Sequence, residues 1–455
     1  MKLLNANAWK LLVAWIVILS ILYSTLSVIR HNHFQSGGFD LGLYDQAVWQ
    51  YSRFQYPFNT IKDRFILGDH LTLTLPLLAP LFWMWNDVRM LLIFQAIWVS
   101  FSILAVYKLV FLRKFSPFVA LCISIIYSLF YGIQYGIFFD FHPVLLATGL
   151  IPWMLYFLES KKTKLFFISL ALLLLTQENM GFAVVSLGFI YFFRNKKMGI
   201  AFIIGGIAAS FVCMKVINLF FPFQYMPQII WNPAEFFNSP EKQQVWLYTL
   251  SAFSFLPIFS PGALLAIGFD LAQYFITGPE FNRMWSPYMH HRAILAPFVL
   301  LGTLDALQLL KKHTRMIVIF LIISALFQQY YFHFPLNKLA KPEFWKTETW
   351  ETDNQKMLST IPKDVPVVTQ QSLVPHLSHR NQIYIAWPRV HEPGWWLDFD
   401  KNAQYLLIDT HPGIWLTMLL ETPARVTEAL TNMEKAGKIS LLKQINAIRL
   451  YKIDK

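Results

Sequence analysis

The sequence predicts a helical membrane protein that crosses the bilayer many times and ends in a small α/β domain. Of its 455 residues, 56% are hydrophobic and only 14% are charged, whereas soluble domains have roughly 45–50% apolar and about 25% charged residues. After about residue 334 the composition becomes mixed and polar, which predicts a separate folded domain. These two observations exclude an ordinary soluble enzyme.

Apolar segments follow one another along the first three quarters of the chain. The first, residues 11–29, is longer than the hydrophobic region of a usual signal peptide, so we interpret it as a retained helix. The later segments are residues 90–112, 117–138, 143–159, 165–177, 180–193, 199–221, 245–259, 262–277, 287–310 and 316–333. Together they predict about eleven transmembrane helices, although several are shorter than the ~20 residues that span a bilayer upright.

Four dense basic clusters predict the orientation of these helices. They lie at residues 113–114, 161–164, 194–197 and 311–315. All four are cytoplasmic if the first helix runs from the inside to the outside and residues 71–86 form a Pro-broken helix on the outer surface. We assign the clusters no role beyond topology, and we expect a multi-pass protein of the inner (plasma) membrane. Its domains are residues 1–334, with an outer loop at 30–89, and a non-cytoplasmic soluble domain at 335–455.

The C-terminal domain is predicted to be α/β. Short apolar segments between turn residues predict strands at 365–369 (VPVVT), 382–387 (QIYIAW) and 403–409 (AQYLLID) and a final hairpin at 438–453. Helical patterning covers residues 347–360 and 422–436. No Gly-rich phosphate loop opens a helix here, so no nucleotide site is indicated. The loop 391–400, HEPGWWLDFD, places two Trp beside acidic residues, and we expect it to help hold an acceptor.

Charge and cysteine content exclude two other classes of function. The net charge of +12 is explained by Lys and Arg in cytoplasmic loops, so no nucleic-acid partner is expected. Cys122 and Cys213 lie inside apolar runs with no Cys or His at ligand spacing. A disulfide framework and a Cys-based metal site are therefore excluded.

Ionisable residues recur where the predicted helices reach the outer side. Such residues near a membrane are costly and are functional candidates by default. From the N-terminus onward they are Asp40 and Asp45, Asp69 and His70, Asp140 and His142, Glu178, and Glu280, His290, His291 and Arg292. The predicted topology brings all of them to the outer face of the membrane. This convergence is the main reason to treat them as candidates for one functional site.

Each candidate also has a structural interpretation. Asp40 or Asp45 can cap a short helix, and for the pair we weigh capping and function equally. Asp140, just before His142-Pro143, can end one helix and begin the next. Glu178 between two apolar helices requires a partner, which favours function. The histidines can be interfacial, but Arg292 beside them makes an anion site plausible.

Sugar transfer from a lipid-linked donor would use this set of residues. A carboxylate can accept the proton of an incoming hydroxyl as a general base. Arg, His or a divalent cation such as Mg or Mn can neutralise a departing polyprenyl phosphate. A lipid phosphate carrier would also account for the membrane body and for the missing nucleotide motif.

The sequence resembles a family of predicted prokaryotic membrane proteins named domain of unknown function 2079. The motifs are FDLGLYDQAVW, GDH, FDFHPV, QENMGF and YMHHRAILAPF. More distantly it resembles the C-type (GT-C) glycosyltransferases. That resemblance implies a helical body whose first outer loop holds the catalytic Asp, with a polyprenyl-linked sugar as donor. By position Asp40 or Asp45 would be this residue, although many relatives have adjacent acidic residues where LGLY separates these two.

Other functional classes remain as alternatives. A transporter or lipid flippase would use Glu178, Asp140 and the histidines as an ion relay. It predicts repeated halves and charges well inside a span, and we identify neither. A binding module would need only one helix as its anchor. Within the enzyme hypothesis, Asp40 is predicted to be the base because Gly37-Gly38 precede it, and Asp45 is predicted to hold the loop.

Overall fold

The computed structural model describes residues 2–220, 228–230, 232–386, 402–411 and 422–454. The chain divides into two compact units, and each is described by itself. Unit 1 comprises residues 1–26, 67–74 and 93–341, and unit 2 comprises residues 27–66, 75–92 and 342–455. The predicted loop 391–400 lies outside the described residues.

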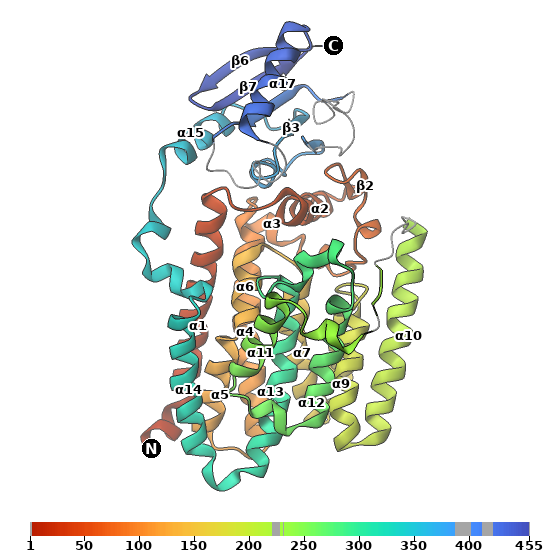
Figure 1. The fold of residues 1–455 in the computed structure, drawn as a ribbon, viewed down its shortest axis with the longest axis vertical. Coiled ribbons are helices and arrows are strands. Elements are labelled where there is room, and N and C mark those ends of the chain that lie inside the picture. The colour runs from red at the N-terminus through yellow and green to blue at the C-terminus, as the bar shows by residue number, and fades with distance from the viewer. Residues whose placement is uncertain (1, 221–227, 231, 387–401, 412–421, 455) are drawn as a thin grey trace. The chain divides into compact units, whose positions relative to one another are not determined.

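Unit 1 is built from helices (Figure 1). Each predicted apolar segment coincides with one helix or with two consecutive ones. The helices are α1 (Lys2–Asn32), α4 (Arg89–Leu112), α5 (Pro117–Ser128), α6 (Tyr131–Phe139), α7 (Pro143–Glu159), α8 (Thr163–Leu174), α9 (Met180–Arg194), α10 (Lys196–Phe220), α11 (Pro240–Ser251), α12 (Pro261–Phe275), α13 (Leu295–Leu309) and α14 (Thr314–Tyr331), with a 3-10 segment η7 (His290–Ile294) before α13.

The predicted count of about eleven spans is not confirmed. Among the described residues, five helices are long and apolar enough to cross a membrane, and α5 with α6 makes a sixth if this pair, bent by 45°, is one span. Helices α7, α8 and α9 are apolar but shorter than a full span. Most residues of α7 and α9 are buried inside the unit, whereas α8 exposes apolar side chains such as Phe167 and Ile168. The sequence pattern alone does not distinguish these cases from a full span.

The core of unit 1 lies among α4, α5, α6, α7, α9, α12 and α13. By contrast, only 22% of the most apolar stretch of α10 and 28% of that of α14 are buried. An exposed face this apolar would be unfavourable in water, so these helices present it to lipid. The molecule is a multi-pass membrane protein.

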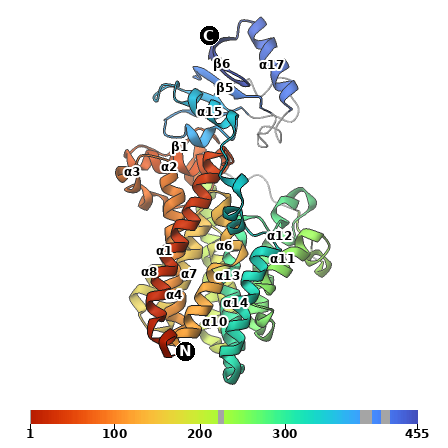
Figure 2. The same ribbon diagram turned by 90° about the vertical axis from the view of Figure 1, so that its left-hand side faces the viewer.

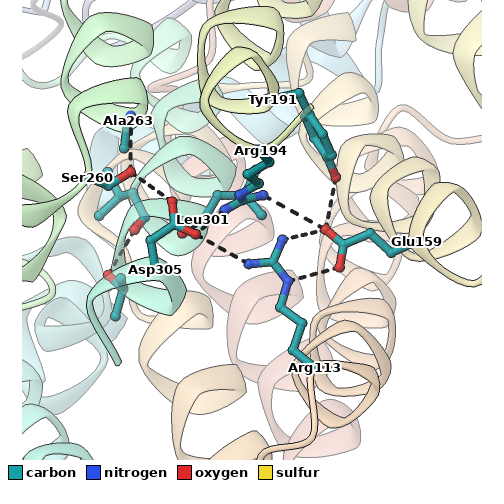
Figure 3. Close-up of polar contacts among 10 residues, drawn as sticks. Arg113, Glu159, Tyr191, Arg194, Ser260, Ala263, Leu301 and Asp305 are labelled. Atoms are coloured by element: carbon teal, nitrogen blue, oxygen red, sulfur yellow. Dashed lines mark hydrogen bonds and ion pairs between the residues drawn. The ribbon is translucent and has the colours of Figure 1, made fainter. Parts of the chain in front are cut away.

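A network of charged side chains joins four helix ends of unit 1 (Figure 3). Arg113 after α4 bonds Glu159 at the end of α7, and Tyr191 Oη donates to the same carboxylate at 2.9 Å. Arg194 of α9 pairs with Asp305 of α13, which also accepts from Ser260 at 2.8 Å. The basic clusters that contain Arg113 and Arg194 therefore do more than set topology, because their side chains cross-link the helices.

Unit 2 contains the elements of the first loop. They are η1, a single π-helical turn (Gly38–Gly42), α2 (Leu43–Ser52), β1 (Phe58–Asn59), β2 (Arg64–Phe65), η3 (Leu75–Leu78) and α3 (Leu81–Met84). The last two occupy the predicted Pro-broken helix, with Pro76 in η3 and Pro80 at the N-cap of α3. Proline lacks the N–H that helix continuation requires, so two short turns replace one helix.

The C-terminal part of unit 2 has the predicted α/β organisation. Its elements are α15 (Thr349–Leu358), β3 (Val367–Thr369), β4 (Ile383–Ile385), β5 (Tyr405–Asp409), α17 (Pro423–Lys435), β6 (Ile439–Ile445) and β7 (Ile448–Ile453). The sheet order is β4-β3-β5-β7-β6, in which β4, β3 and β5 are parallel and β7 and β6 form an antiparallel hairpin. All of the strands and both helices predicted for this region are present.

Helices cover both faces of this sheet (Figure 2). Side chains alternate between the faces of a strand. Val367 and Leu407 therefore pack with Met357 of α15, while their neighbours Val368 and Leu406 pack on the other face with α17. This two-sided burial explains why the parallel strands read as continuous apolar runs.

The first loop packs against the C-terminal residues within unit 2. Phe34 and Ile61 belong to the same apolar cluster as Met357. Gly38 is needed for this contact, because a Cβ there would lie 2.9 Å from Val374 Cβ and from Ile385 Cδ1. The division into domains at residue 334/335 stays a prediction, since the compact unit also takes in parts of the outer loop.

Candidate active site

The predicted site residues fall into two groups. Unit 1 contains Asp69, His70, Asp140, His142, Glu178, Glu280, His290, His291 and Arg292, and unit 2 contains Asp40 and Asp45. Within unit 1, contacts or electrostatic interactions connect most of the basic residues and Glu178.

Glu178 has the partner that its position requires. It lies between α8 and α9, and its Oε1 is 2.8 Å from His70 Nδ1, while Oε2 accepts from the Leu71 N–H at 3.0 Å. Burial alone would raise the pKa of Glu178, but the charge and hydrogen bonds of His70 and the Leu71 N–H hold this pKa below its usual value. Glu178 is thus an ionised carboxylate that orients His70.

The junction between α6 and α7 is held by one buried amide. Gln95 of α4 donates from Nε2 to the Asp140 carbonyl at 3.0 Å and accepts from the His142 N–H at 2.8 Å. Asp140 is extended and buried, and His142 is the N-cap of α7 before Pro143. Because both backbone groups are fixed, the two side chains between the helices have defined positions.

Three histidines lie together beside this junction. The His142 and His290 rings are stacked, with centroids 3.6 Å apart and an interplanar angle of 18°. The His290 and His291 centroids are 4.0 Å apart with the rings tilted by 58°, and His291 stacks on Tyr274 at 5.1 Å. Residues separated by almost 150 positions are thus in ring contact, as the convergence argument predicts for His142 and His290.

Arg292 is completely buried next to the histidines. Its Nε donates to the Ser286 carbonyl at 3.3 Å and its Nη2 donates to the Met284 carbonyl, while the guanidinium lies 5.0 Å from the Tyr274 ring centroid. The turn that holds it packs directly on α6, where a Cβ at Gly132 would lie 2.3 Å from the Arg292 carbonyl oxygen. Only glycine permits this approach.

Electrostatic interactions extend the group to His70 and to a residue that the sequence analysis missed. His142, His291, His70 and Arg292 all lie close enough to His290 to interact with it electrostatically. Asp270 of α12 interacts with Arg292 and is 3% exposed. Asp270 could have been identified from the sequence, because it is a lone carboxylate inside the apolar segment 262–277. The interpretation that no charge lies well inside a span overlooked it.

Several nitrogens in this group have no hydrogen-bond partner among the described residues. They are His290 Nδ1, His291 Nδ1 and Arg292 Nη1, all buried. A buried polar atom without a partner costs roughly 1–3 kcal/mol. Arg292 Nη1 can only donate, so an anionic ligand would supply its missing acceptor, and a histidine whose Nδ1 carries the proton would add a second donor.

In unit 2, Asp45 is bound by two C-terminal residues. It is fully buried at the start of α2, where its carboxylate accepts a short hydrogen bond from Ser378 Oγ. His379 Nε2 lies 3.1 Å from both carboxylate oxygens. His379 also contacts the rings of Trp49 and Phe82. Asp45 therefore joins the first loop to the segment 378–379.

Asp40 has a different environment. It lies in the π-helical turn η1 and is partly exposed, and its backbone N–H donates to the Gly37 carbonyl at 3.3 Å. Gly38 donates to the Gln371 carbonyl at 3.0 Å. Gly38 thus allows the first loop to pack closely against Val374 and Ile385. We had expected it to let the backbone approach the substrate.

Glu280 and Asp69 complete the predicted residues of unit 1. Glu280 is exposed in the 3-10 segment Pro279–Trp285, where it accepts from the Gln228 N–H at 3.4 Å. Asp69 is partly buried beside His70.

A divalent cation finds no ligand set in the described part of the chain. No group of three or more His, Cys, Asp or Glu side chains comes together there in a way that could hold a metal ion. We therefore assign no residue to Mg or Mn.

Solved structures show which fold this is. ArnT from Cupriavidus metallidurans, a GT-C glycosyltransferase, in the apo state has a TM-score of 0.59 and 10% identity, with 98% of each chain covered. The crystal structure of the same protein bound to undecaprenyl phosphate has a TM-score of 0.54 and 9% identity, again with 98% of each chain covered. At this identity the similarity shows a GT-C-like fold. No curated protein matches the sequence.

The sequence profile of one family matches almost the whole chain. The family is described as "Predicted membrane protein (DUF2079)", and the match covers residues 30–435. This range includes every candidate residue of both units. With a match over far more than half of its length, the chain belongs to the DUF2079 family of predicted membrane proteins.

Proposed function

We propose that this protein is a membrane glycosyltransferase that moves a sugar from a polyprenyl-phosphate donor to an acceptor on the non-cytoplasmic face. The observation that carries the proposal is the buried group of His142, His290, His291 and Arg292 inside a GT-C-like fold. Its nitrogens that lack partners among the described residues suit the phosphate of the donor.

The proposed reaction uses one carboxylate as a base. A carboxylate accepts the proton of the acceptor hydroxyl, with Asp40 of unit 2 kept as the candidate for this base from the sequence, and the hydroxyl oxygen then attacks the anomeric carbon of the donor sugar. The bond between that carbon and the phosphate oxygen breaks, and its electron pair leaves with the polyprenyl phosphate. Arg292 and His290 stabilise the negative charge on this leaving group. Asp45 keeps the loop in place through Ser378 and His379.

The relative with bound lipid supports the choice of donor. ArnT has been crystallised with undecaprenyl phosphate, and its fold covers 98% of this chain. We extend the polyprenyl phosphate to the present protein as part of the proposal, with the sugar and the acceptor left open. The inner (plasma) membrane and a non-cytoplasmic C-terminal domain belong to the same proposal. No step is assigned to a metal ion.

The test is a transfer assay with purified full-length protein in nanodiscs. Undecaprenyl phosphate should bind and should compete with an undecaprenyl-phosphate sugar, and extracts of envelope glycans should supply an acceptor that becomes labelled from a radioactive donor. His290→Ala should weaken lipid binding, while the exposed His313→Ala in the loop before α14 serves as the matched control. Unchanged lipid binding in His290→Ala would contradict the phosphate site.

One observation favours a second function. Asp270 of α12 and Arg292 are both buried ionisable residues of the helical unit, and such residues also occur in transporters and flippases. A flippase would move fluorescent polyprenyl phosphate across proteoliposomes without releasing sugar. Lipid movement without transfer, abolished by Asp270→Asn, would replace the transferase proposal with this one.

A further inference from the structure

Unit 2 contains a large cavity that the proposed reaction does not use. Its volume is about 740 Å³, within the range of roughly 300–1,000 Å³ that is usual for small-molecule sites. All of its described lining residues belong to unit 2 and come from four segments: the end of α1, the end of α2 with the turn after it, residues 86–89, and residues 355–381.

The lining of this cavity is basic. Four cationic side chains, Arg53, Arg89, Lys363 and Arg380, face two carboxylates, Asp87 and Asp364. Asp87 is already engaged by Arg89, with Nε 2.7 Å from Oδ1. Burial lowers the pKa of Arg380 to about 10, so this guanidinium stays charged at neutral pH. An excess of positive charge therefore remains for a ligand.

Two buried nitrogens of the lining have no hydrogen-bond partner among the described residues. One is Nε1 of Trp49, a side chain that is only 7% exposed, and the other is Nε2 of His376. Arg53 lies over the same Trp49 ring at 4.7 Å. An indole N–H can only donate, so a ligand that satisfies it must bring an acceptor oxygen.

The chemistry of the lining indicates a small polar ligand. Most of the described lining residues are polar or charged, and the aliphatic ones are Val88, Leu358, Ile361, Pro375 and Leu377. A polyprenyl chain would need a continuous apolar path, which this lining lacks. The cationic side chains and the polar groups of the lining are instead suited to a hydroxyl-rich ligand with an acidic substituent, such as an acidic sugar.

We infer that this cavity binds a saccharide bearing a phosphate or carboxylate group, with Trp49 donating to a sugar or acid oxygen and Arg53 and Lys363 attracting the charge. The inference rests on the proposed function only where it makes this saccharide the acceptor. The binding itself does not require transfer.

Isothermal titration calorimetry on the full-length protein in nanodiscs tests the site. The probes are glucose 6-phosphate, glucuronate, glucose and inorganic phosphate. Glucose 6-phosphate or glucuronate should bind, with affinity that decreases as salt increases, and glucose and inorganic phosphate should each bind at least about tenfold more weakly. Tighter binding of glucose 6-phosphate would identify the acidic group as a phosphate, and tighter binding of glucuronate would identify it as a carboxylate. Equal affinity for inorganic phosphate and the acidic sugars would overturn the saccharide assignment.

Variants connect the binding to this cavity. Arg53→Gln with Lys363→Gln should weaken the affinity about tenfold, because both side chains are exposed at the cavity and make no structural ion pair that is described. Lys435→Gln, on exposed helix α17 and outside the lining, is the matched control and should bind as the wild type does. Unchanged affinity in the double variant would rule out the site.

Trp49→Phe separates a binding role from a structural one. It removes the N–H and part of a buried ring, so the melting temperature of the free protein should decrease through lost packing, and the affinity for the acidic sugar should fall several-fold because the donor is lost. A lower melting temperature with unchanged affinity would show a structural role and overturn the inference. Binding of the acidic sugar without transfer activity would contradict the proposed function but support this site. Transfer activity without such binding would support the proposed function and contradict this site.

Discussion

His70 Nδ1 lies 2.8 Å from Glu178 Oε1, although 108 positions separate the two residues. Gln177 Nε2 is also 3.3 Å from His70 Nδ1, so the end of α8 and residues 70–71 form one polar cluster. The pair connects a segment of the first outer loop to the helical core of unit 1. It thereby places an ionised carboxylate and an imidazole next to the stacked histidines.

The Glu178 interaction predicts a loss of stability in acid. The folded-state pKa of Glu178 lies below its usual value of 4.5, so its stabilising contribution is complete above about pH 4.5 and is lost as the pH falls through the lower folded pKa. Thermal unfolding between pH 3 and 7 should show a shallower acid decline for Glu178→Gln than for the wild type. Parallel acid declines would contradict this assignment.

The two loop carboxylates should differ in what their substitution affects. Asp40→Asn removes a base from a partly exposed position, so transfer should fall by roughly 10²–10⁴-fold while the melting temperature and lipid binding stay the same. Asp45→Asn weakens buried contacts with Ser378 and His379, so it should lower the free energy of unfolding by about 1–3 kcal/mol. Full transfer activity in the double variant would exclude both as the base.

His290 should contribute to the stabilisation of the leaving group. His290→Ala should reduce kcat/KM by roughly 10²–10³-fold if the imidazole donates to the departing phosphate. His290→Gln, which keeps a hydrogen-bond donor, should recover part of that loss. If the Ala and Gln variants are equally impaired in transfer and equally destabilised, His290 has a packing role instead.

Cysteine labelling can test the orientation. In a background without Cys122 and Cys213, Gln55→Cys and Ser359→Cys introduce exposed thiols in unit 2, and Lys162→Cys introduces one in a basic cluster. An impermeant maleimide added to intact cells should label the first two and spare the third until the cells are lysed. The opposite pattern would place the proposed site in the cytoplasm.

The network in Figure 3 should contribute strongly to stability. Arg113 is 8% exposed and Glu159 is 19% exposed, so Arg113→Ala leaves a largely buried carboxylate without its main partner. We expect a loss of roughly 3–5 kcal/mol in the free energy of unfolding. Arg315→Ala, an exposed Arg of another basic cluster, is the control and should change stability by less than about 0.5 kcal/mol. Equal effects would show that the network is not stabilising.

Local patterns were sufficient to predict most elements. Hydropathy located the helices, and short apolar runs between turn residues located the strands from β3 to β7, because each depends on which side chains face a neighbouring surface within one element. The number of spans could not be predicted in this way. An apolar helix packed inside the unit, such as α7 or α9, has the same composition as one that crosses the bilayer.

Motifs alone identified His142, Glu178, His290 and Arg292 as candidates, because ionisable residues beside apolar segments are costly and therefore conspicuous. Their partners were decided by tertiary structure. Nothing local links Glu178 to His70, His142 to His290, or Asp45 to Ser378 and His379, since these contacts depend on how distant helices and loops pack. The same holds for Asp270, whose importance becomes evident only beside Arg292.

The sequence by itself determined that this is a multi-pass membrane protein with a C-terminal α/β region and a set of polar residues at helix ends. Only the tertiary structure decided that the first loop packs with the C-terminal residues in one compact unit, that Gly38 serves this packing, and that a basic cavity lies within it. The physical reason is that hydrophobic periodicity is a property of single elements, whereas cavities and ion pairs are formed by side chains from several elements.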